Sequence, residues 1–254
     1  MADFGTSRKK SLSDISAIGF NWSGTISNDL RLAYMANKWM SINLGLAMDD
    51  DLETWANLPV CSPAEYYATK LQETKRSGNA TAYERLANLT EKGYAVLFRQ
   101  MSERVGHALR DAQPKPFPGA VKAIHSLARA TKLLSTSNRM VPRIFVVAAC
   151  QEDRLFVDAT GYGLNRHTEF WKVVGDVVNT PAVIREIVFN EMALTMDQVA
   201  YVGGTRADVK MAKACGMTSV AVLSGYNKEC DLRNEQPDFV FKDVAEFARA
   251  FLYA

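Results

Sequence analysis

Three short polar segments of this chain have the residue types and spacing that could do chemistry. They are Asn21-Trp22-Ser23-Gly24-Thr25, Ser137-Asn138 and Gly204-Thr205-Arg206-Ala207-Asp208. Each segment follows an apolar run that reads as a strand, and the carboxyl ends of parallel strands lie at one edge of a sheet. Amides and hydroxyls can hydrogen-bond to a small anion. We therefore expect these side chains to lie close together at one cleft, and Asp208 is the only carboxylate in the three segments.

The amide of Asn21 restricts what the first segment can do. An Asn side chain has no negative charge and almost no nucleophilicity. It therefore forms neither a covalent phosphoryl intermediate nor a strong bond to a hard cation. No Asp or Glu lies between Asp14 and Asp29, so the segment holds no replacement carboxylate close to Asn21.

The first two segments resemble motifs of the haloacid dehalogenase-like (HAD) superfamily. Residues 18–25 are similar to its first motif, an apolar strand followed by Asp-x-Asp/Ala-Gly-Thr. Asn21 stands at the first acid position and Ser23 at the third. Ser137 is similar to the Ser or Thr of the second motif, which binds a phosphoryl oxygen in that superfamily.

The third segment resembles the fourth motif of the superfamily, an apolar strand that ends in Gly-Asp-x-x-x-Asp. In residues 199–208, Gly204 replaces the first acid and Asp208 keeps the second. The third motif, a Lys or Arg before a Pro-rich helix start, would fall at residues 178–180, which are Val, Asn and Thr. The nearest cations are Lys172 and Arg185, and neither stands in the motif position.

Within the superfamily, the chain resembles the phosphonoacetaldehyde hydrolase-like and phosphoglycolate phosphatase-like branch, which carries a helical cap. In phosphonoacetaldehyde hydrolase-like relatives Ala occupies the position of Ser23, so Ser23 by itself argues little against activity. An aromatic residue occupies the position of Trp22 in phosphonoacetaldehyde hydrolase-like relatives. Trp22 is therefore equally suited to line the mouth of a pocket or to fill the core.

The resemblance leaves two functions open. The losses at Asn21, Gly204 and the third motif favour a catalytically inactive HAD-like protein, retained for binding or for a structural role in a protein assembly. The alternative is a divergent phosphohydrolase or phosphonate hydrolase, acting on a small phosphorylated metabolite. The first hypothesis implies no catalytic residue, metal or cofactor, and Mg²⁺ belongs to the alternative alone. The expected vestigial phosphate site consists of Asn21, Trp22, Ser23, Ser137, Asn138 and Asp208.

Several of these residues also have a structural interpretation. Thr205 and Asp208 form a capping-box pattern at the start of a predicted helix, so Asp208 can serve helix stability alone. Ser137 and Asn138 can cap the helix that would follow them, with or without a ligand. Gly24 fits a tight turn that the loop needs whatever the site does.

Hydrophobic periodicity divides the chain into a core and an inserted cap. Residues 28–113 show helical spacing without strand-like alternation, which predicts an all-helical cap. Residues 15–27 and 114–254 are expected to form an α/β core with a Rossmann-like parallel sheet, because strands and helices alternate from Pro114 onward. Residues 1–14 are expected to be a disordered tail.

The strands and helices of the core have clear signals. We expect strands near residues 16–20, 132–136, 199–203, 218–223 and 239–241. We expect helices after Pro118, after Thr180, at 206–215 with Gly216 as the stop, and at 244–252.

The first half of the cap is rich in large apolar and aromatic side chains. They are Tyr34, Trp39, Met40, Met48, Trp55, Tyr66 and Tyr67. This is more than a small helical cap needs for its own core. We therefore expect part of the group to be exposed and to contact a protein partner. The competing interpretation is that these residues close over the cleft.

Composition indicates an ordinary intracellular protein. The chain has 254 residues and a net charge of +2, without the basic excess of a nucleic-acid-binding protein. The apolar run at 144–150 is far shorter than the ~20 residues of a membrane span. The four cysteines, which lack metal-ligand spacing, read as reduced and mostly buried thiols. We expect a cytoplasmic location, with an organellar matrix as the alternative because the first residues include Arg and Ser.

Overall fold

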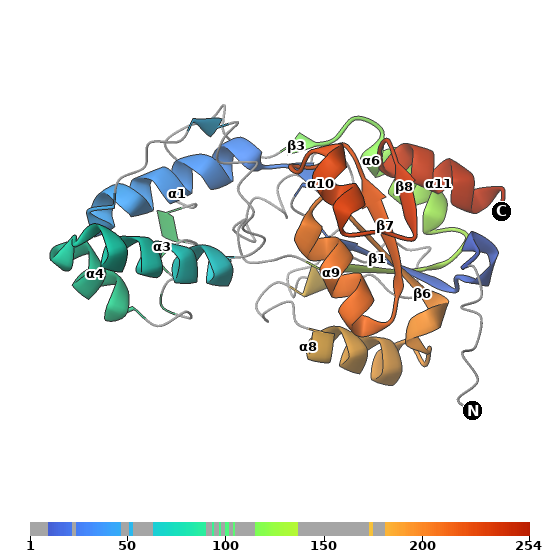
Figure 1. Ribbon diagram of the computed structural model, residues 1–254. Coiled ribbons are helices and arrows are strands. Elements are labelled where there is room, and N and C mark those ends of the chain that lie inside the picture. Colours follow the sequence, from blue (N-terminus) through green and yellow to red (C-terminus); the bar gives the residue numbers. More distant parts are fainter. Residues whose placement is uncertain are drawn as a thin grey trace.

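The computed structural model shows an α/β core beside a helical cap (Figure 1). It describes residues 10–21, 24–46, 51–52, 63–89, 93, 97, 100–101, 104, 115–136, 173–174 and 181–254. A parallel sheet lies at the centre of the core, so the predicted fold class is confirmed.

The sheet has six strands. In chain order they are β1 (Ala17–Asn21), β4 (Lys132–Thr136), β5 (Val173–Val174), β6 (Val199–Gly203), β7 (Thr218–Val222) and β8 (Phe239–Phe241). The order across the sheet is β5-β4-β1-β6-β7-β8, and every neighbouring pair is parallel. Because β1 lies between β4 and β6, the loop after β1 is flanked by the carboxyl ends of both neighbours.

Helices cover both faces of the sheet. The helical elements of the core are η1 (Leu12–Asp14), α6 (Ala120–Leu127), α8 (Pro181–Glu186), η3 (Ile187–Glu191), η4 (Met196–Gln198), α9 (Arg206–Cys215), α10 (Glu229–Asn234) and α11 (Val244–Leu252). α6 and α11 pack together over one face, and α8 and α9 pack over the other (Figure 1). The predicted bounds of α9 and α11 agree with the structure.

The side chains of β1 alternate between these two faces. Ile18 and Phe20 join the apolar cluster under α6 and α11. Ala17 joins the cluster under α8 and α9. Because strand residues alternate in direction, Asn21 shares the face of Ala17. This alternation directs the side chain of Asn21, the last residue of β1, toward the start of α9.

The described part of the cap is helical. It comprises α1 (Leu30–Leu44), α3 (Pro63–Ser77) and α4 (Ala80–Ala87), with its own apolar cluster. Two short antiparallel strands, β2 (Ser27–Asn28) and β3 (Lys115–Pro116), connect it to the core. They lie next to the predicted cap ends at residues 28 and 113.

Some cap residues that we expected on a contact surface belong to the interior. Met40 is fully buried in the cap cluster, so it forms no part of such a surface. Trp39 is half-buried and packs against both the cap cluster and the core cluster. Tyr34 is half-buried, with Lys38 Nζ 5.8 Å from its ring centroid. Met48, Trp55 and the side chains of Tyr66 and Tyr67 lie outside the described residues.

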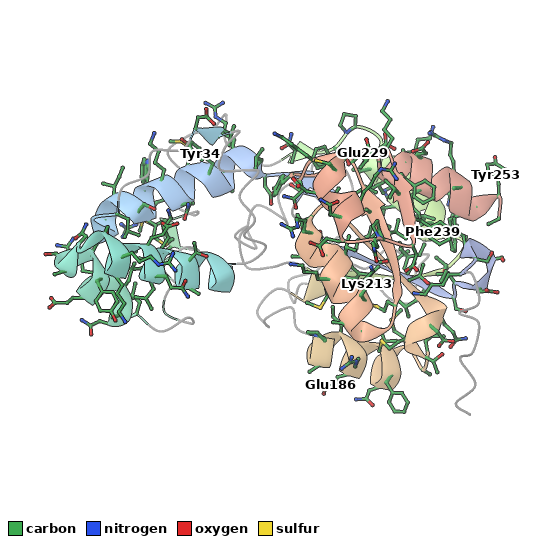
Figure 2. The ribbon with its side chains drawn as sticks, in the orientation of Figure 1. Tyr34, Glu186, Lys213, Glu229, Phe239 and Tyr253 are labelled. Carbon is green, nitrogen blue, oxygen red and sulfur yellow. The ribbon has the colours of Figure 1, made fainter. Side chains whose placement is uncertain are left out.

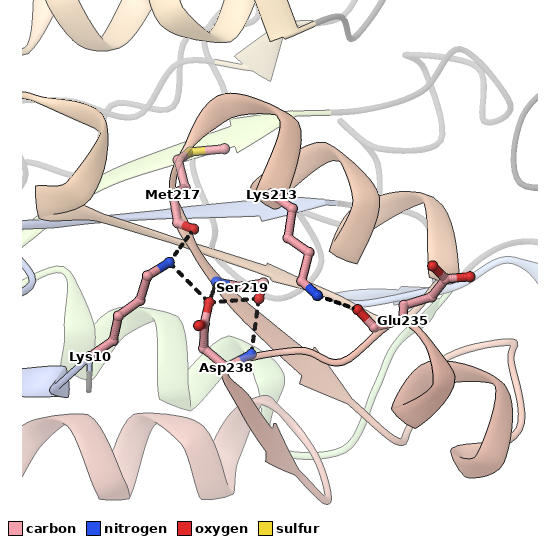
Figure 3. Close-up of polar contacts among 6 residues, drawn as sticks. All are labelled: Lys10, Lys213, Met217, Ser219, Glu235 and Asp238. Atoms are coloured by element: carbon pink, nitrogen blue, oxygen red, sulfur yellow. Dashed lines mark hydrogen bonds and ion pairs between the residues drawn. The ribbon is translucent and has the colours of Figure 1, made fainter. Parts of the chain in front are cut away.

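The end of the predicted tail is bound to the core, so the expectation of disorder is wrong there. Leu12 is buried in η1. Lys10 Nζ donates to the Met217 carbonyl at 2.8 Å and to Asp238 Oδ2 at 3.1 Å (Figure 3). These partners come from residues more than 200 positions away, and only the folded sheet brings them to Lys10.

Hydrogen bonds of Asp238 link the amino-terminal end of β7 to the segment before β8. Its Oδ2 accepts from the Ser219 amide at 2.8 Å and the Ser219 hydroxyl at 2.7 Å (Figure 3). Burial raises the pKa of Asp238, but the hydrogen bonds from Ser219 and Lys10 outweigh it and hold the pKa below its ordinary value. Nearby, Lys213 Nζ donates to the Glu235 carbonyl (Figure 3).

Two further findings concern the cysteines and the hydropathy of the helices. Cys215 is a buried thiol, but Cys230 is exposed, which corrects the expectation of buried thiols at that position. Cys61 and Cys150 lie outside the described residues. Among the helices of the described segments, we find none with the length and hydropathy of a membrane span.

Candidate functional site

The ends of β1 and β6 bring Asn21 and Asp208 together. Asn21 is the last residue of β1, and Asp208 lies in the first turn of α9; both are buried. Asn21 Nδ2 donates to Asp208 Oδ2 at 3.2 Å. Gly203 permits this approach, because a Cβ there would lie 2.0 Å from Asp208 Cβ. The structure thus joins the first polar segment to the third.

The same carboxylate oxygen caps α9. Asp208 Oδ2 accepts from the Thr205 amide at 2.9 Å and from the Thr205 hydroxyl at 2.8 Å. The hydroxyl in turn accepts from the Asp208 amide at 3.3 Å, which completes a capping box. With the bond from Asn21, three donors converge on one oxygen. Asp208 therefore has the structural role that its spacing from Thr205 predicted.

Burial raises the pKa of Asp208 from 3.8 to about 6. Taking a carboxylate out of water disfavours its charged form. Hydrogen bonds from Thr205 and Asn21 act in the opposite direction and do not overcome burial. Asp208 therefore titrates nearer to neutrality than an ordinary carboxyl group.

Gly204, at the lost acid position, lies in a crowded contact between backbones. A Cβ on Gly204 would lie 2.0 Å from the Gly24 carbonyl oxygen and 2.7 Å from Gly225 Cα. The Gly204 amide donates to Thr25 Oγ1 at 2.9 Å. The loops after β1, β6 and β7 thus contact one another at Gly24, Gly204 and Gly225. The direction in which an acid at position 204 would project is filled by the main chain.

The loop after β7 completes the site, and our sequence reasoning missed it. The Tyr226 ring lies 3.1 Å from where a Cβ on Gly24 would stand, and Gly24 has a left-handed φ of +69°. Asn227 Oδ1 accepts from the Arg206 amide at 2.8 Å. A sequence signal existed, because Ser224-Gly-Tyr-Asn follows a predicted strand just as the other polar segments do.

The remaining predicted site residues are not brought together by the described structure. Trp22, Ser23, Ser137, Asn138, Lys172 and residues 178–180 lie outside the described residues. The Arg185 guanidinium donates to the Ala214 carbonyl near the carboxyl end of α9. That end is about 15 Å from the start of a ten-residue helix. Arg185 therefore does not supply the missing cation beside Asn21.

Known proteins resemble this chain in part of its sequence and in its fold. The HAD-hydrolase-like family matches residues 166–247. A phosphoglycolate phosphatase from Mannheimia succiniciproducens is 33% identical over 52 residues, which are 20% of this chain and 23% of that protein's length. Over these residues the chain is similar in sequence to the haloacid dehalogenase-like superfamily. The match includes β6, α9, β7 and β8, and the segment that resembles the fourth motif lies in β6 and the start of α9.

Solved structures share the HAD-like fold over nearly the whole chain. A predicted phosphatase from Clostridium acetobutylicum has a TM-score of 0.66 at 15% identity, and a HAD-like hydrolase from Streptococcus pneumoniae has 0.65 at 14%. A predicted phosphoglycolate phosphatase from Haemophilus somnus has 0.64 at 18%. Each comparison covers 94% of this chain and 99% of the other. At these identities the likeness shows the fold alone.

The described donor set of this HAD-like chain does not fit the divalent cation that the superfamily implies. Hard cations take several oxygen ligands, among them charged carboxylates. Here Asn21 is an amide, Gly204 has no side chain, and Asp208 Oδ2 already accepts three hydrogen bonds. Among the described residues, no three His, Cys, Asp or Glu side chains gather at one place.

We therefore expect magnesium titrated into the protein to give no saturable heat in a calorimeter. The physical reason is that one engaged carboxylate cannot replace the hydration shell of a strongly hydrated ion. Asp208→Asn is the matched control, and its titration is expected to be the same as that of the wild type. Saturable binding that disappears in Asp208→Asn would contradict this reading of the site.

Proposed function

We propose that this chain is a catalytically inactive HAD-like protein, retained for binding or for a structural role in a protein assembly. The packing around Gly204 carries the proposal. The carbonyl of Gly24 occupies the place of a side chain at position 204. The backbone therefore leaves no room for an acid at that position. Asn21 then hydrogen-bonds to the remaining acid.

Three described amides near Asn21 and Asp208 bear on whether a small anion could bind there. An anion at a helix start needs backbone N–H groups that point at it. The amide of Gly204 donates to Thr25, that of Thr205 donates to Asp208, and that of Arg206 donates to Asn227. These three donors are already used inside the protein, so among the described residues they are not available to a phosphate.

A second candidate function is a divergent phosphohydrolase, and the relatives support it. The proteins named above are called phosphatases or hydrolases, which favours this candidate over inactivity at the level of the family. Asp208 is also present with a pKa of about 6, within the range that suits proton transfer. This candidate requires a nucleophile other than Asn21.

A turnover assay separates the two candidates. With magnesium, the purified protein is expected to hydrolyse phosphoglycolate, phosphonoacetaldehyde and p-nitrophenyl phosphate no faster than background. Loss of the nucleophile and of the charge stabiliser forfeits most of an enhancement that is typically at least ~10⁶-fold. Asn21→Asp is expected to stay inactive, because Gly204 remains. Turnover that Asp208→Asn abolishes would instead establish the phosphohydrolase.

A further inference from the structure

A groove with a volume of about 500 Å³ lies on the core, where β3 leads into α6. Its lining consists of residues 116–119 and of Val121, Lys122 and His125 in the first turns of α6. Small-molecule sites have volumes of about 300–1,000 Å³ and combine apolar walls with a few polar groups. None of the lining residues belongs to the candidate site described above, so the groove is a separate candidate for ligand binding.

The apolar wall of the groove is held in place by the fold. Pro116 lies opposite Ser27 in the β2–β3 ladder. The Phe117 amide donates to the Ile26 carbonyl at 2.8 Å. Phe117 and Val121 are half-buried and pack against the core cluster, so the wall is formed before a ligand arrives and binding requires little ordering. The Phe117 ring also offers an aromatic surface on which a planar ring can stack.

The groove opens on a surface whose exposed charges are positive. Residues 115–136, which contain α6, include no Asp or Glu, and the side chains of Lys122 and Arg129 are exposed. α11 packs beside α6 and adds the exposed Arg249, and Lys242 is exposed just before that helix. Such a surface attracts anions, because exposed charges of one sign raise the local concentration of ions of the other sign.

The acids beside these cations are used as helix caps. Asp243 Oδ1 accepts from the Glu246 amide at 2.7 Å, and Glu246 Oε2 accepts from the Lys242 amide. Both acids are half-buried. An exposed acid such as Glu186 lies on α8, over the other face of the sheet (Figure 2). The exposed charged side chains in the described α6–α11 layer are therefore all cations.

Lys122 places one of these cations at the groove itself. Among the described residues, no hydrogen bond or ion pair engages its ammonium group. An ammonium group binds phosphate as a strong point charge. His125 lies three positions later on the same side of α6 and adds an imidazole to the lining. The groove thus joins an aromatic wall to a cation, a combination that is complementary to a planar ring carrying a phosphate.

We propose that the groove between β3 and α6 binds a free nucleoside phosphate, with the base against Phe117 and the phosphate at Lys122. A single nucleotide fits better than a strand, because strands use successive aromatic platforms and this lining has one phenyl ring. The inference goes beyond the proposed function, since the groove is separate from Asn21 and the binding involves no catalysis.

Calorimetric titration with three ligands tests the pairing of ring and phosphate. Adenosine monophosphate (AMP) is expected to saturate the protein with a Kd below about 1 mM. Adenosine lacks the phosphate and ribose 5-phosphate lacks the base, so each is expected to bind at least roughly tenfold more weakly. AMP that does not saturate the protein, or ribose 5-phosphate that binds as tightly as AMP, would overturn the proposal.

Two charge reversals test the place of binding. Lys122→Glu is expected to weaken AMP binding by roughly tenfold or more, because an acid replaces the cation that meets the phosphate. The control Lys75→Glu makes the same change at an exposed position of the cap and is expected to leave the affinity unchanged. Both side chains are exposed, and unchanged thermal unfolding confirms that each variant is folded.

A third variant and amide NMR separate this groove from the Asn21 site. Asp208→Asn is expected to bind AMP as the wild type does, whatever the turnover assay shows. The amide signals of residues 119–125 are expected to shift on addition of AMP, and those of residues 203–208 are not. AMP binding that survives Lys122→Glu, shifts confined to residues 203–208, or an oligonucleotide that binds far more tightly than AMP would each contradict the proposed site.

Discussion

Gly204→Ala is expected to lower the free energy of unfolding by roughly 3 kcal/mol, the upper end of ordinary overpacking. The added Cβ would stand 2.0 Å from the Gly24 carbonyl oxygen, and neither partner is the flexible end of a side chain. Relief therefore requires the loops after β1 and β6 to separate. Urea unfolding of the wild type and the variant measures the difference.

Gly78→Ala is the matched control for this effect. Gly78 has a left-handed φ of +72°, but no atom lies within 4 Å of its would-be Cβ. Alanine there costs about 1 kcal/mol of backbone strain without a clash. Gly204 is not one of the described glycines that have a left-handed φ. The destabilisation by Gly204→Ala is therefore expected to be steric. A loss at Gly204 no larger than that at Gly78 would show that the loops part easily.

This packing also bears on whether acids can be introduced at positions 21 and 204. Asn21→Asp changes a side chain that has room in its present place, opposite Asp208. Gly204→Asp has no such room, since the backbone of Gly24 fills the site. The proposed inactivity would therefore rest on the relative position of two loops and not on residue 21 alone.

The stability of the wild type relative to Asp208→Asn is expected to fall by about 3 kcal/mol as pH rises from well below 3.8 to well above 6. Burial raises the pKa of Asp208 in the folded state to about 6, against 3.8 for an ordinary carboxyl. Between these values the folded chain holds a proton that the unfolded chain has lost. The stabilisation is therefore complete below the lower pKa and lost through the higher one, at 1.36 kcal/mol per pKa unit.

Urea unfolding of both proteins across this pH window measures the effect. Asn keeps the shape of the side chain and an acceptor for Thr205, so subtraction isolates the titration of Asp208. Asp238→Asn is the control of opposite sign, because the pKa of Asp238 is lowered and its contribution is lost as pH falls. Parallel pH profiles for the wild type and Asp208→Asn would refute the raised pKa.

The elements of the core could be read from the sequence because they rest on local and periodic signals. α9 begins at Thr205-Arg206 and ends before Gly216, as its capping box and stop residue predict. β8 and α11 also have their predicted bounds. Binding of Lys10 to Asp238 could not be read, because it joins residues 228 positions apart that carry no local pattern.

The sequence by itself determined the chemistry that position 21 can offer, the absence of a side chain at position 204, and the capping role of Asp208. These follow from residue type and from spacing within a few positions. Only the tertiary structure decided that Gly24 fills the place of the lost acid, that Asn21 donates to Asp208, and that burial raises the pKa of that carboxyl. The physical reason is that the backbone contact at Gly204 and the removal of Asp208 from water depend on how the loops after β1, β6 and β7 pack together. No local sequence pattern encodes that packing.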